Sequence, residues 1–283
     1  MELYPIFDGN ENFSPNIWYS VSGIGESPLL RVGHTSVHIR SSDNSESDKG
    51  KLYFIGGANP SNCFNDVYFL DLNTLAWDKY EDLENFENGR YEHASLSTNN
   101  KEIFIFGGAS QEESFDNILK FDLDNKKCEK IECTSSIKPC ARTIHVGTSY
   151  KDQLLIFGGG KNGRSPVEDQ NVYIFNPTRQ KWVSLNINGA KPNARHGHVM
   201  INYQDDLVYV HGGMENEKIF DDMWALNLRS MSWNEIEPKS STRPKARAAH
   251  GGISVNKNLY IFGGISPEGF ALDDLWKFDI GKF

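Results

Sequence analysis

Apolar and polar positions alternate along this chain in short bursts that are separated by Gly-, Asn- and Asp-rich turns. Five apolar runs, LYFI, IFIF, LLIF, VYVH and LYIF, each end at a Gly-Gly pair, beginning at Gly56, Gly107, Gly158, Gly212 and Gly263. After a turn, each pair is followed by a second apolar run: NDVYFLDL, DNILKFDL, QNVYIFNP, DDMWALNL and DDLWKFDI. Short runs of this kind, bounded by turn residues, predict β-strands. The pattern therefore predicts an all-β chain.

The Gly-Gly pairs mark copies of one repeating unit. Their spacings are 51, 51, 54 and 51 residues. An Arg-x-x-His motif precedes each pair, at Arg31/His34, Arg90/His93, Arg142/His145, Arg195/His198 and Arg247/His250. A tryptophan closes three of the units, at Trp77, Trp182 and Trp233, and Cys128 takes that position in the second unit. Because the short strands of one unit cannot bury both of their faces, we expect the units to stack around a ring and cover one another.

This repeat resembles the kelch repeat, in which each unit forms one four-stranded blade of a β-propeller. The resemblance implies five recognisable blades, with repeats at about 31–77, 90–128, 142–182, 195–233 and 247–283. They form a propeller over 17–283 that follows an N-terminal segment, 1–16.

The register of the first tryptophan predicts how the ring closes. Trp18 lies 59 residues before Trp77, and Arg31 lies 59 residues before Arg90, so Trp18 falls at the closing-strand position of a preceding unit. We therefore expect the strand around Trp18 to complete the blade that begins at His250. A closed five-bladed ring would hide both sheet edges. The alternative is a six-bladed propeller whose last unit is absent from this chain.

Charge and cysteine content narrow the class of protein. The 283 residues carry a formal net charge of −9, which argues against sequence-independent nucleic-acid binding because such binding needs a positive surface. No apolar run approaches the roughly 18 residues that span a bilayer. The four cysteines, at 63, 128, 133 and 140, form no CxxC pair, which is typical of reduced thiols in a cytosolic protein.

The histidines and tryptophans follow the repeat and therefore indicate architecture. Five of the eight histidines belong to the Arg-x-x-His motif, and His38, His196 and His211 lie in different units. Three or four converging ligands, as a zinc or copper site requires, are not evident. The tryptophans occupy strand positions and are expected in the core between blades. The sequence thus predicts no catalytic residue, no cofactor and no metal site.

The five repeat arginines, Arg31, Arg90, Arg142, Arg195 and Arg247, are the candidate partner-binding residues. If their guanidinium groups point toward the mouth of the ring, they would form a basic ring that binds carboxylates of a partner. The alternative is that each forms a salt bridge with an acidic residue of its own blade.

Function on a shared scaffold is expected in the loops that differ between blades. The loops between second and third strands are 58–65, 109–116, 160–170, 214–220 and 265–272. The loops that join blades, 78–89, 130–141, 184–194 and 234–246, are predicted to open on the same face. Of these, 78–89 is acidic and the end of the last, 237–247, is basic, which would orient a partner electrostatically.

Several segments are similar to kelch-motif effectors of a late-endosomal Rab GTPase: WYSV, RVGH, GGANP, RYEHAS, FGGG, RHGHVM and YIFGG. This resemblance implies a cytosolic protein, peripheral to the endosome membrane through its partners, that binds the GTP-loaded Rab and supports endosome to trans-Golgi network transport. A phosphoinositide kinase is a further partner class that it implies. The chain departs from these effectors where they carry a sixth repeat with an acidic, Ser-rich insertion.

The leading hypothesis is therefore a non-enzymatic protein-interaction scaffold. Two alternatives stay open. One is a kelch adaptor of another kind, a substrate receptor or cytoskeletal scaffold. The other is a metal-dependent kelch enzyme, although the iron-binding Glu-x-x-x-Asp-x-x-x-His pattern of one such group ends here at Ala225, after Glu217 and Asp221.

Overall fold

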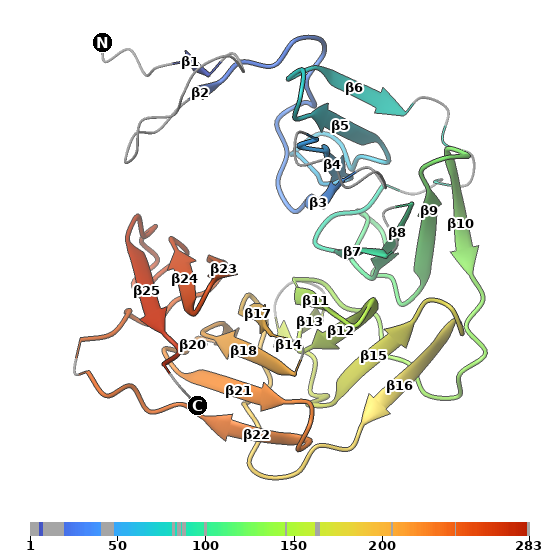
Figure 1. Ribbon diagram of the computed structural model, residues 1–283. Coiled ribbons are helices and arrows are strands. Elements are labelled where there is room, and N and C mark those ends of the chain that lie inside the picture. Colours follow the sequence, from blue (N-terminus) through green and yellow to red (C-terminus); the bar gives the residue numbers. More distant parts are fainter. Residues whose placement is uncertain are drawn as a thin grey trace.

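A computed structural model describes residues 6–7, 20–40, 48–80, 83, 86, 89–98, 101–144, 146–161, 165–204, 206–240 and 242–281. These residues form strands, turns and bends, and none of them lies in a helix. Five antiparallel sheets follow one another around an arc, with the first strand of each sheet toward the centre (Figure 1). The predicted all-β propeller with five blades is confirmed.

The first two blades are complete four-stranded meanders. Blade one contains β3 (Thr35–Ile39), β4 (Lys51–Ile55), β5 (Val67–Asp71) and β6 (Trp77–Tyr80). Blade two contains β7 (Ala94–Thr98), β8 (Glu102–Phe106), β9 (Ile118–Asp122) and β10 (Lys127–Ile131). Sequential antiparallel pairing of this kind needs only short turns between neighbouring strands.

Blades three and four repeat the meander and add a small hairpin in the loop after the Gly-Gly pair. Blade three contains β11 (Val146–Tyr150), β12 (Gln153–Phe157), β15 (Val172–Asn176) and β16 (Lys181–Leu185), with the hairpin β13 (Gly160–Lys161) and β14 (Ser165–Pro166). Blade four contains β17 (Val199–Tyr203), β18 (Leu207–His211), β21 (Met223–Asn227) and β22 (Ser232–Glu235), with the hairpin β19 (Met214–Glu215) and β20 (Lys218–Ile219).

Blade five has three strands, β23 (Gly251–Val255), β24 (Asn258–Phe262) and β25 (Leu275–Asp279). The predicted fourth strand, around Trp18, lies outside the described residues. The segment that follows Trp18, β2 (Ser20–Val21), pairs in parallel with β1 (Ile6–Phe7) instead of with β25. Closure of the ring by this segment therefore stays a prediction.

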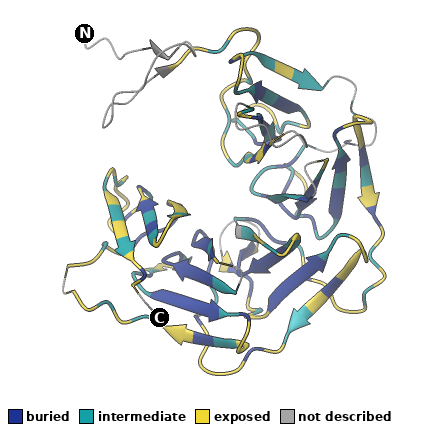
Figure 2. Cartoon of the chain, viewed as in Figure 1, coloured by how far each residue is buried: buried dark blue, intermediate teal, exposed yellow. Residues whose placement is uncertain are grey.

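The core lies between blades because alternate residues of each strand point to opposite faces of the sheet. Ile103 and Ile105 of β8 pack toward blade one, and Phe104 and Phe106 of the same strand pack toward blade three. Figure 2 shows this as dark blue strands in the middle of the arc. On blade five, Phe262 and Leu275 remain 50% and 66% exposed because no further sheet among the described residues covers them.

Two of the three closing tryptophans, Trp182 and Trp233, belong to this core as predicted, whereas Trp77 is only partly buried. Trp182 of blade three packs edge-on against Phe106 of blade two, with ring centroids 4.9 Å apart. Trp233 of blade four packs in the same way on Phe157 of blade three, at 5.2 Å. Both indoles are 4% exposed. The fourth strand of one blade thus covers the second strand of the preceding blade.

All ten glycines of the Gly-Gly pairs have a positive φ. Gly212 shows why a side chain is not tolerated there: its φ is 62°, and a Cβ would lie 2.6 Å from the carbonyl oxygen of Arg247 and 2.9 Å from the ring of His250. The pair therefore lets the second strand of one blade meet the Arg-x-x-His segment of the next at van der Waals distance.

Candidate partner-binding face

The two predicted sets of loops meet on one face of the arc, which we call the loop face. Asn65 donates a hydrogen bond to the carbonyl oxygen of Phe86 at 3.1 Å, and Gln170 donates to that of Pro192 at 3.2 Å. At corresponding places, Asp116 forms an ion pair with Lys138 at 2.7 Å and Asp221 with Arg243 at 3.0 Å. In each of these four blades, the loop before the third strand contacts the loop that leaves the blade. The prediction of a shared face is confirmed.

Each repeat arginine connects the Gly-Gly pair of its own blade to the start of the third strand, and we call this set of contacts the brace. Its Nη1 donates to the carbonyl oxygen of the first glycine of the Gly-Gly pair at 2.8–3.1 Å, in the pairs Arg31–Gly56, Arg90–Gly107, Arg142–Gly158, Arg195–Gly212 and Arg247–Gly263. The guanidinium group also contacts a polar side chain near the start of the third strand: Asp66, Asn117, Asp169, Asp222 and Asp274, in the same order.

These contacts place the arginines in the scaffold. Arg142, Arg195 and Arg247 are fully buried, and Arg90 is 2% exposed. In three blades the guanidinium carbon also lies 4.0–4.4 Å from the centre of a phenylalanine ring, those of Phe64, Phe115 and Phe220. The geometry matches the alternative of salt bridges within the blade in blades one, three, four and five, whereas Arg90 of blade two contacts the amide of Asn117. Contact between these five arginines and a partner stays a prediction.

In blades four and five the ion pair lowers the pKa of the acidic partner. Hydrogen bonds from Arg247 lower the pKa of Asp274 to about 2. Burial works against ionisation of Asp222, but the hydrogen bonds from Arg195 still hold the pKa of this carboxyl below its usual value. The carboxylates are therefore charged at neutral pH, as a buried guanidinium requires. In four blades the partner of the arginine directly precedes the third strand, whereas in blade three it is Asp169, three residues before Val172.

The inner rim of the loop face carries a strained backbone. The residue before each repeat histidine adopts a positive φ at Gly33, Glu92, Ile144, Gly197 and Ala249. Its backbone N–H donates to the equivalent carbonyl of the preceding blade, from Glu92 to Gly33 at 2.6 Å, from Gly197 to Ile144 at 3.2 Å and from Ala249 to Gly197 at 2.7 Å. Non-glycine residues in this conformation cost free energy and cluster at functional sites. Glycine at two of the five positions was the sequence signal for it.

Side chains at this rim differ from blade to blade. The residue after each repeat arginine is Val32, Tyr91, Thr143, His196 or Ala248. Next to Tyr91, Glu92 is half-buried, and burial raises the pKa of its carboxyl. Thr143, His196 and Ala248 are buried, whereas Val32 is 73% exposed and Tyr91 is partly exposed. Because Val32 and Tyr91 are accessible and depart from the repeat, they are better candidates for specific recognition than the arginines.

Exposed apolar side chains also gather on the loop face at the two ends of the arc. Leu30 and Val32 of blade one are 92% and 73% exposed, and Phe270 in the 265–272 loop of blade five is 70% exposed. Solvated residues of this size at the ends of loops are typical of protein-binding surfaces.

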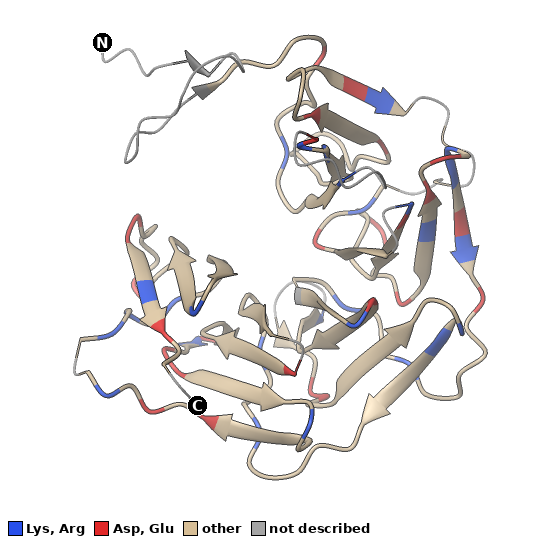
Figure 3. Ribbon diagram, in the orientation of Figure 1, with Lys and Arg blue, Asp and Glu red and all other residues tan. Residues whose placement is uncertain are grey.

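Charge on the described surface is mixed. Figure 3 shows Lys and Arg residues interspersed with Asp and Glu residues around the arc. In the basic 237–247 stretch, Arg243 already pairs with Asp221. Half of the acidic 78–89 loop, at 81–82, 84–85 and 87–88, lies outside the described residues.

Two histidines from different repeats are in contact inside the molecule. His211 ends β18 at the position of Phe106 and Phe157, and its Nδ1 lies 3.1 Å from Nε2 of the repeat histidine His250. Both rings are buried. Among the described residues, no group of three or more His, Cys, Asp and Glu side chains could hold a metal ion. A search of those residues for a membrane-spanning helix found no candidate.

Comparison with known proteins identifies relatives of this chain. The model of the KLHDC2/KLHL20/DRC7 Kelch-repeats domain matches residues 33–264. The Rab9 effector protein with kelch motifs of Xenopus laevis is 36% identical over 231 residues, which cover 80% of this chain and 61% of the relative. Its Homo sapiens counterpart is 32% identical over 228 residues, covering 79% of this chain and 59% of the relative. The acyl-CoA-binding domain-containing protein 5 of Arabidopsis thaliana is 25% identical over 88% of this chain and 38% of its own length. The chain thus spans 61% and 59% of the length of the two Rab9 effector proteins.

Proposed function

This chain belongs to the kelch-repeat β-propeller family, and we propose that it is a non-enzymatic protein-interaction scaffold whose loop face binds a Rab GTPase in its GTP-bound form. The similarity to the Rab9 effector proteins carries the proposal. The matching kelch-repeat family model covers residues 33–264, which contain blades one to four and the first two strands of blade five.

The loop face has the chemistry that such a partner requires. A GTPase exposes its nucleotide state through switch segments that the γ-phosphate orders, and an effector must contact these segments to distinguish GTP from GDP. Stable interfaces combine large apolar side chains at the centre with polar groups at the rim. Phe270 and Val32 are exposed apolar side chains on this face, and Tyr91 and Glu92 supply polar groups at its inner rim.

A pull-down with immobilised Rab9 tests the proposal. The GTP-locked form should retain this chain, and the GDP-locked form should not. Replacing Phe270 with Ser should reduce retention, whereas the same change at Val183, which is 53% exposed on the outer strand β16, should not. Equal retention by both nucleotide states, or by neither, would reject the Rab partner. Capture of ligase or actin components in its place would favour a kelch adaptor of another type.

The cellular role follows from the partner. A protein that binds the GTP-loaded Rab of late endosomes would reside in the cytoplasm and reach the endosome membrane through that partner. It would act in vesicle transport from endosomes to the trans-Golgi network. Fluorescently tagged chain should therefore move from endosomes to the cytosol when the Rab is held in its GDP form. A phosphoinositide kinase partner rests on the family resemblance alone.

A further inference from the structure

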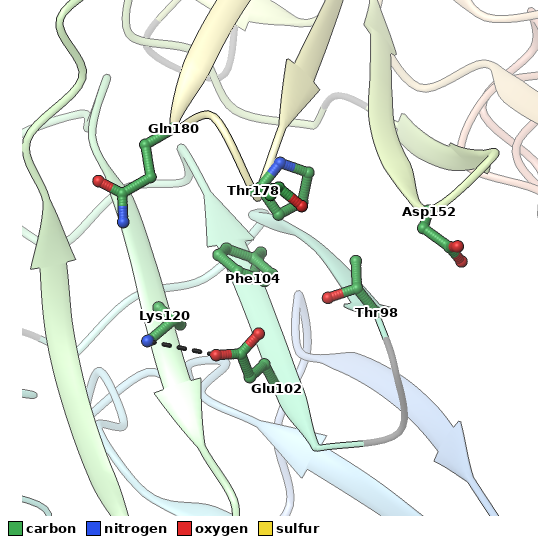
Figure 4. Close-up of a pocket in the computed structure, with 8 residues that line it drawn as sticks. Thr98, Glu102, Phe104, Lys120, Asp152, Thr178 and Gln180 are labelled. Carbon is green, nitrogen blue, oxygen red and sulfur yellow. Dashed lines mark ion pairs between the residues drawn. The ribbon is translucent and has the colours of Figure 1, made fainter.

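A cavity of about 620 Å³ lies between blades two and three, at the end of the strands opposite the loop face. Thr98, Glu102 and Lys120 of blade two line one side of it, and Asp152 and Thr178 of blade three line the other. In Figure 4, Asp152 lies across the cavity from the Glu102–Lys120 ion pair, and the buried ring of Phe104 lies between them. The turns that join first to second and third to fourth strands meet here.

At the corresponding place between blades three and four, side chains of the protein itself form hydrogen bonds and ion pairs with one another. Asp206 stands at the turn position of Asp152, because each directly precedes the second strand of its blade. Arg229 donates to Asp206 Oδ2 from Nη2 at 2.6 Å and from Nε at 3.2 Å. The hydroxyl group of Tyr150 and the ammonium group of Lys151 reach Oδ1 of the same carboxylate at 3.4 and 3.5 Å.

At the cavity the equivalents of these side chains are small. Thr178 stands where blade four has Arg229, two residues after the third strand, and Thr98 stands where blade three has Tyr150, at the end of the first strand. Asp152 forms no ion pair with any residue that the structure describes, and its side chain is exposed. The cavity thus lies where, one junction further along the arc, Asp206 pairs with the 83% exposed side chain of Arg229 and accepts a hydrogen bond from Tyr150.

The remaining charges favour a cation in this volume. Lys120 is held by two glutamates, Glu102 at 3.3 Å and Glu129 at 2.7 Å, so its positive charge is already neutralised. Together with Asp152, this cluster contains three carboxylates and one ammonium group. The hydroxyl group of Thr178 and the amide of Gln180 also line the cavity and can accept hydrogen bonds. A guanidinium group can bind both a carboxylate and neutral acceptors. Its planar N–H groups donate two hydrogen bonds to the carboxylate, and further N–H groups remain for the neutral acceptors.

We propose that the cavity between blades two and three binds an arginine side chain presented by a segment of a partner protein, with Asp152 taking the part that Asp206 plays for Arg229. The site lies on the face opposite the one assigned to the Rab GTPase. Both partners can therefore bind one propeller at the same time.

Titration of the purified chain with acetyl-Gly-Arg-Gly-amide, followed by two-dimensional amide NMR, tests the proposal. The peptide should cause saturable shifts at Thr178 and Gln180, and its citrulline analogue, which has the same shape without the charge, should cause none. Asp152→Asn should weaken binding about tenfold or more, the loss that accompanies one charge-assisted hydrogen-bonded pair. Shifts of equal size with the citrulline peptide, or undiminished binding by Asp152→Asn, would overturn the proposal.

A second pair of variants separates binding from folding. Thr178→Arg should close the cavity from within, so that the peptide no longer binds while the melting temperature rises. Asp206→Asn, at the filled junction, should lower the melting temperature and leave peptide binding unchanged. If Thr178→Arg still bound the peptide, the cavity would not be its site. GTP-locked Rab9 should retain the Asp152→Asn variant and the wild-type chain equally. The Rab-binding proposal and the arginine-binding proposal can therefore be rejected independently of each other.

Discussion

Nη1 of Arg90 lies 3.2 Å from Oδ1 of Asn117, a neutral amide at the place where Arg195 and Arg247 each have an aspartate. Burial therefore dominates at Arg90 and lowers the pKa of its guanidinium to about 10. Blade two keeps the brace but not the opposing charge. A buried charge without a paired charge destabilises a fold.

Asn117→Asp should therefore stabilise the chain. The new carboxylate would meet Arg90 as Asp222 meets Arg195, and we expect a gain of about 1–2 kcal/mol in the free energy of unfolding. Urea denaturation would show it as a higher midpoint with an unchanged slope. In blade three, Arg142 already contacts Asp169 at 3.3 Å, so Asn171→Asp is the control and should bring no gain. A midpoint that falls in Asn117→Asp would contradict this account of the brace.

The buried histidine pair should make the fold sensitive to acid. Burial lowers the pKa of His211 to about 4 and that of His250, which also faces His211 and Arg247, to about 3. In the unfolded chain both should titrate near their ordinary value of about 6.5. Below that pH the unfolded state binds protons that the folded state does not. Stability from this pair is thus complete above about pH 6.5 and is lost as the pH falls toward 4.

His211→Phe, which introduces the residue found in blades two and three, should flatten the fall of the unfolding free energy between about pH 6.5 and 4. Thermal unfolding at several pH values measures this slope. His38→Gln alters an exposed histidine on β3 and should leave the slope unchanged. An equal slope in wild type and His211→Phe would mean that the pair does not govern acid stability.

Gly212→Ala should destabilise the junction of blades four and five severely. The added Cβ would meet the carbonyl oxygen of Arg247 at 2.6 Å, and the left-handed φ of 62° would add strain. We expect a loss of about 2–4 kcal/mol in the free energy of unfolding. Gly251→Ala is the matched control because a Cβ there meets nothing within 4 Å. Chemical denaturation should show a change of less than about 0.5 kcal/mol for that variant.

At the inner rim of the loop face, where the backbone φ is positive, a substitution to glycine should instead raise the free energy of unfolding. Ala249 has a φ of 55° at a position where blades one and four carry glycine. Ala249→Gly should relieve the left-handed strain and raise the free energy of unfolding by up to about 1 kcal/mol, the size of that penalty. Gly197→Ala, at the equivalent position in blade four, should lower it. Differential scanning calorimetry of the two variants should give melting temperatures that move in opposite directions.

The repeat in the sequence was sufficient for the fold class. The spacing of the Gly-Gly pairs and the apolar runs beside them reflect local geometry, namely strand length, turn conformation and the close approach of Gly212 to Arg247, and the structure shows strands where these patterns predicted them. Residues that obey the repeat, such as Trp182 and Trp233, were correctly assigned to the core because their surroundings repeat with them.

What the sequence could not decide depends on neighbours that lie far apart in the chain. The arginines look alike in sequence, yet only the folded blades show that they are buried and that Arg90 faces an amide instead of a carboxylate. His211 and His250 meet only because blade five packs on blade four. The cavity beside Asp152 exists because two small residues, Thr98 and Thr178, from different blades face the same junction. Sequence by itself determined the repeating scaffold, since local turn and strand preferences encode it; tertiary structure decided every feature that depends on the contact between one blade and the next.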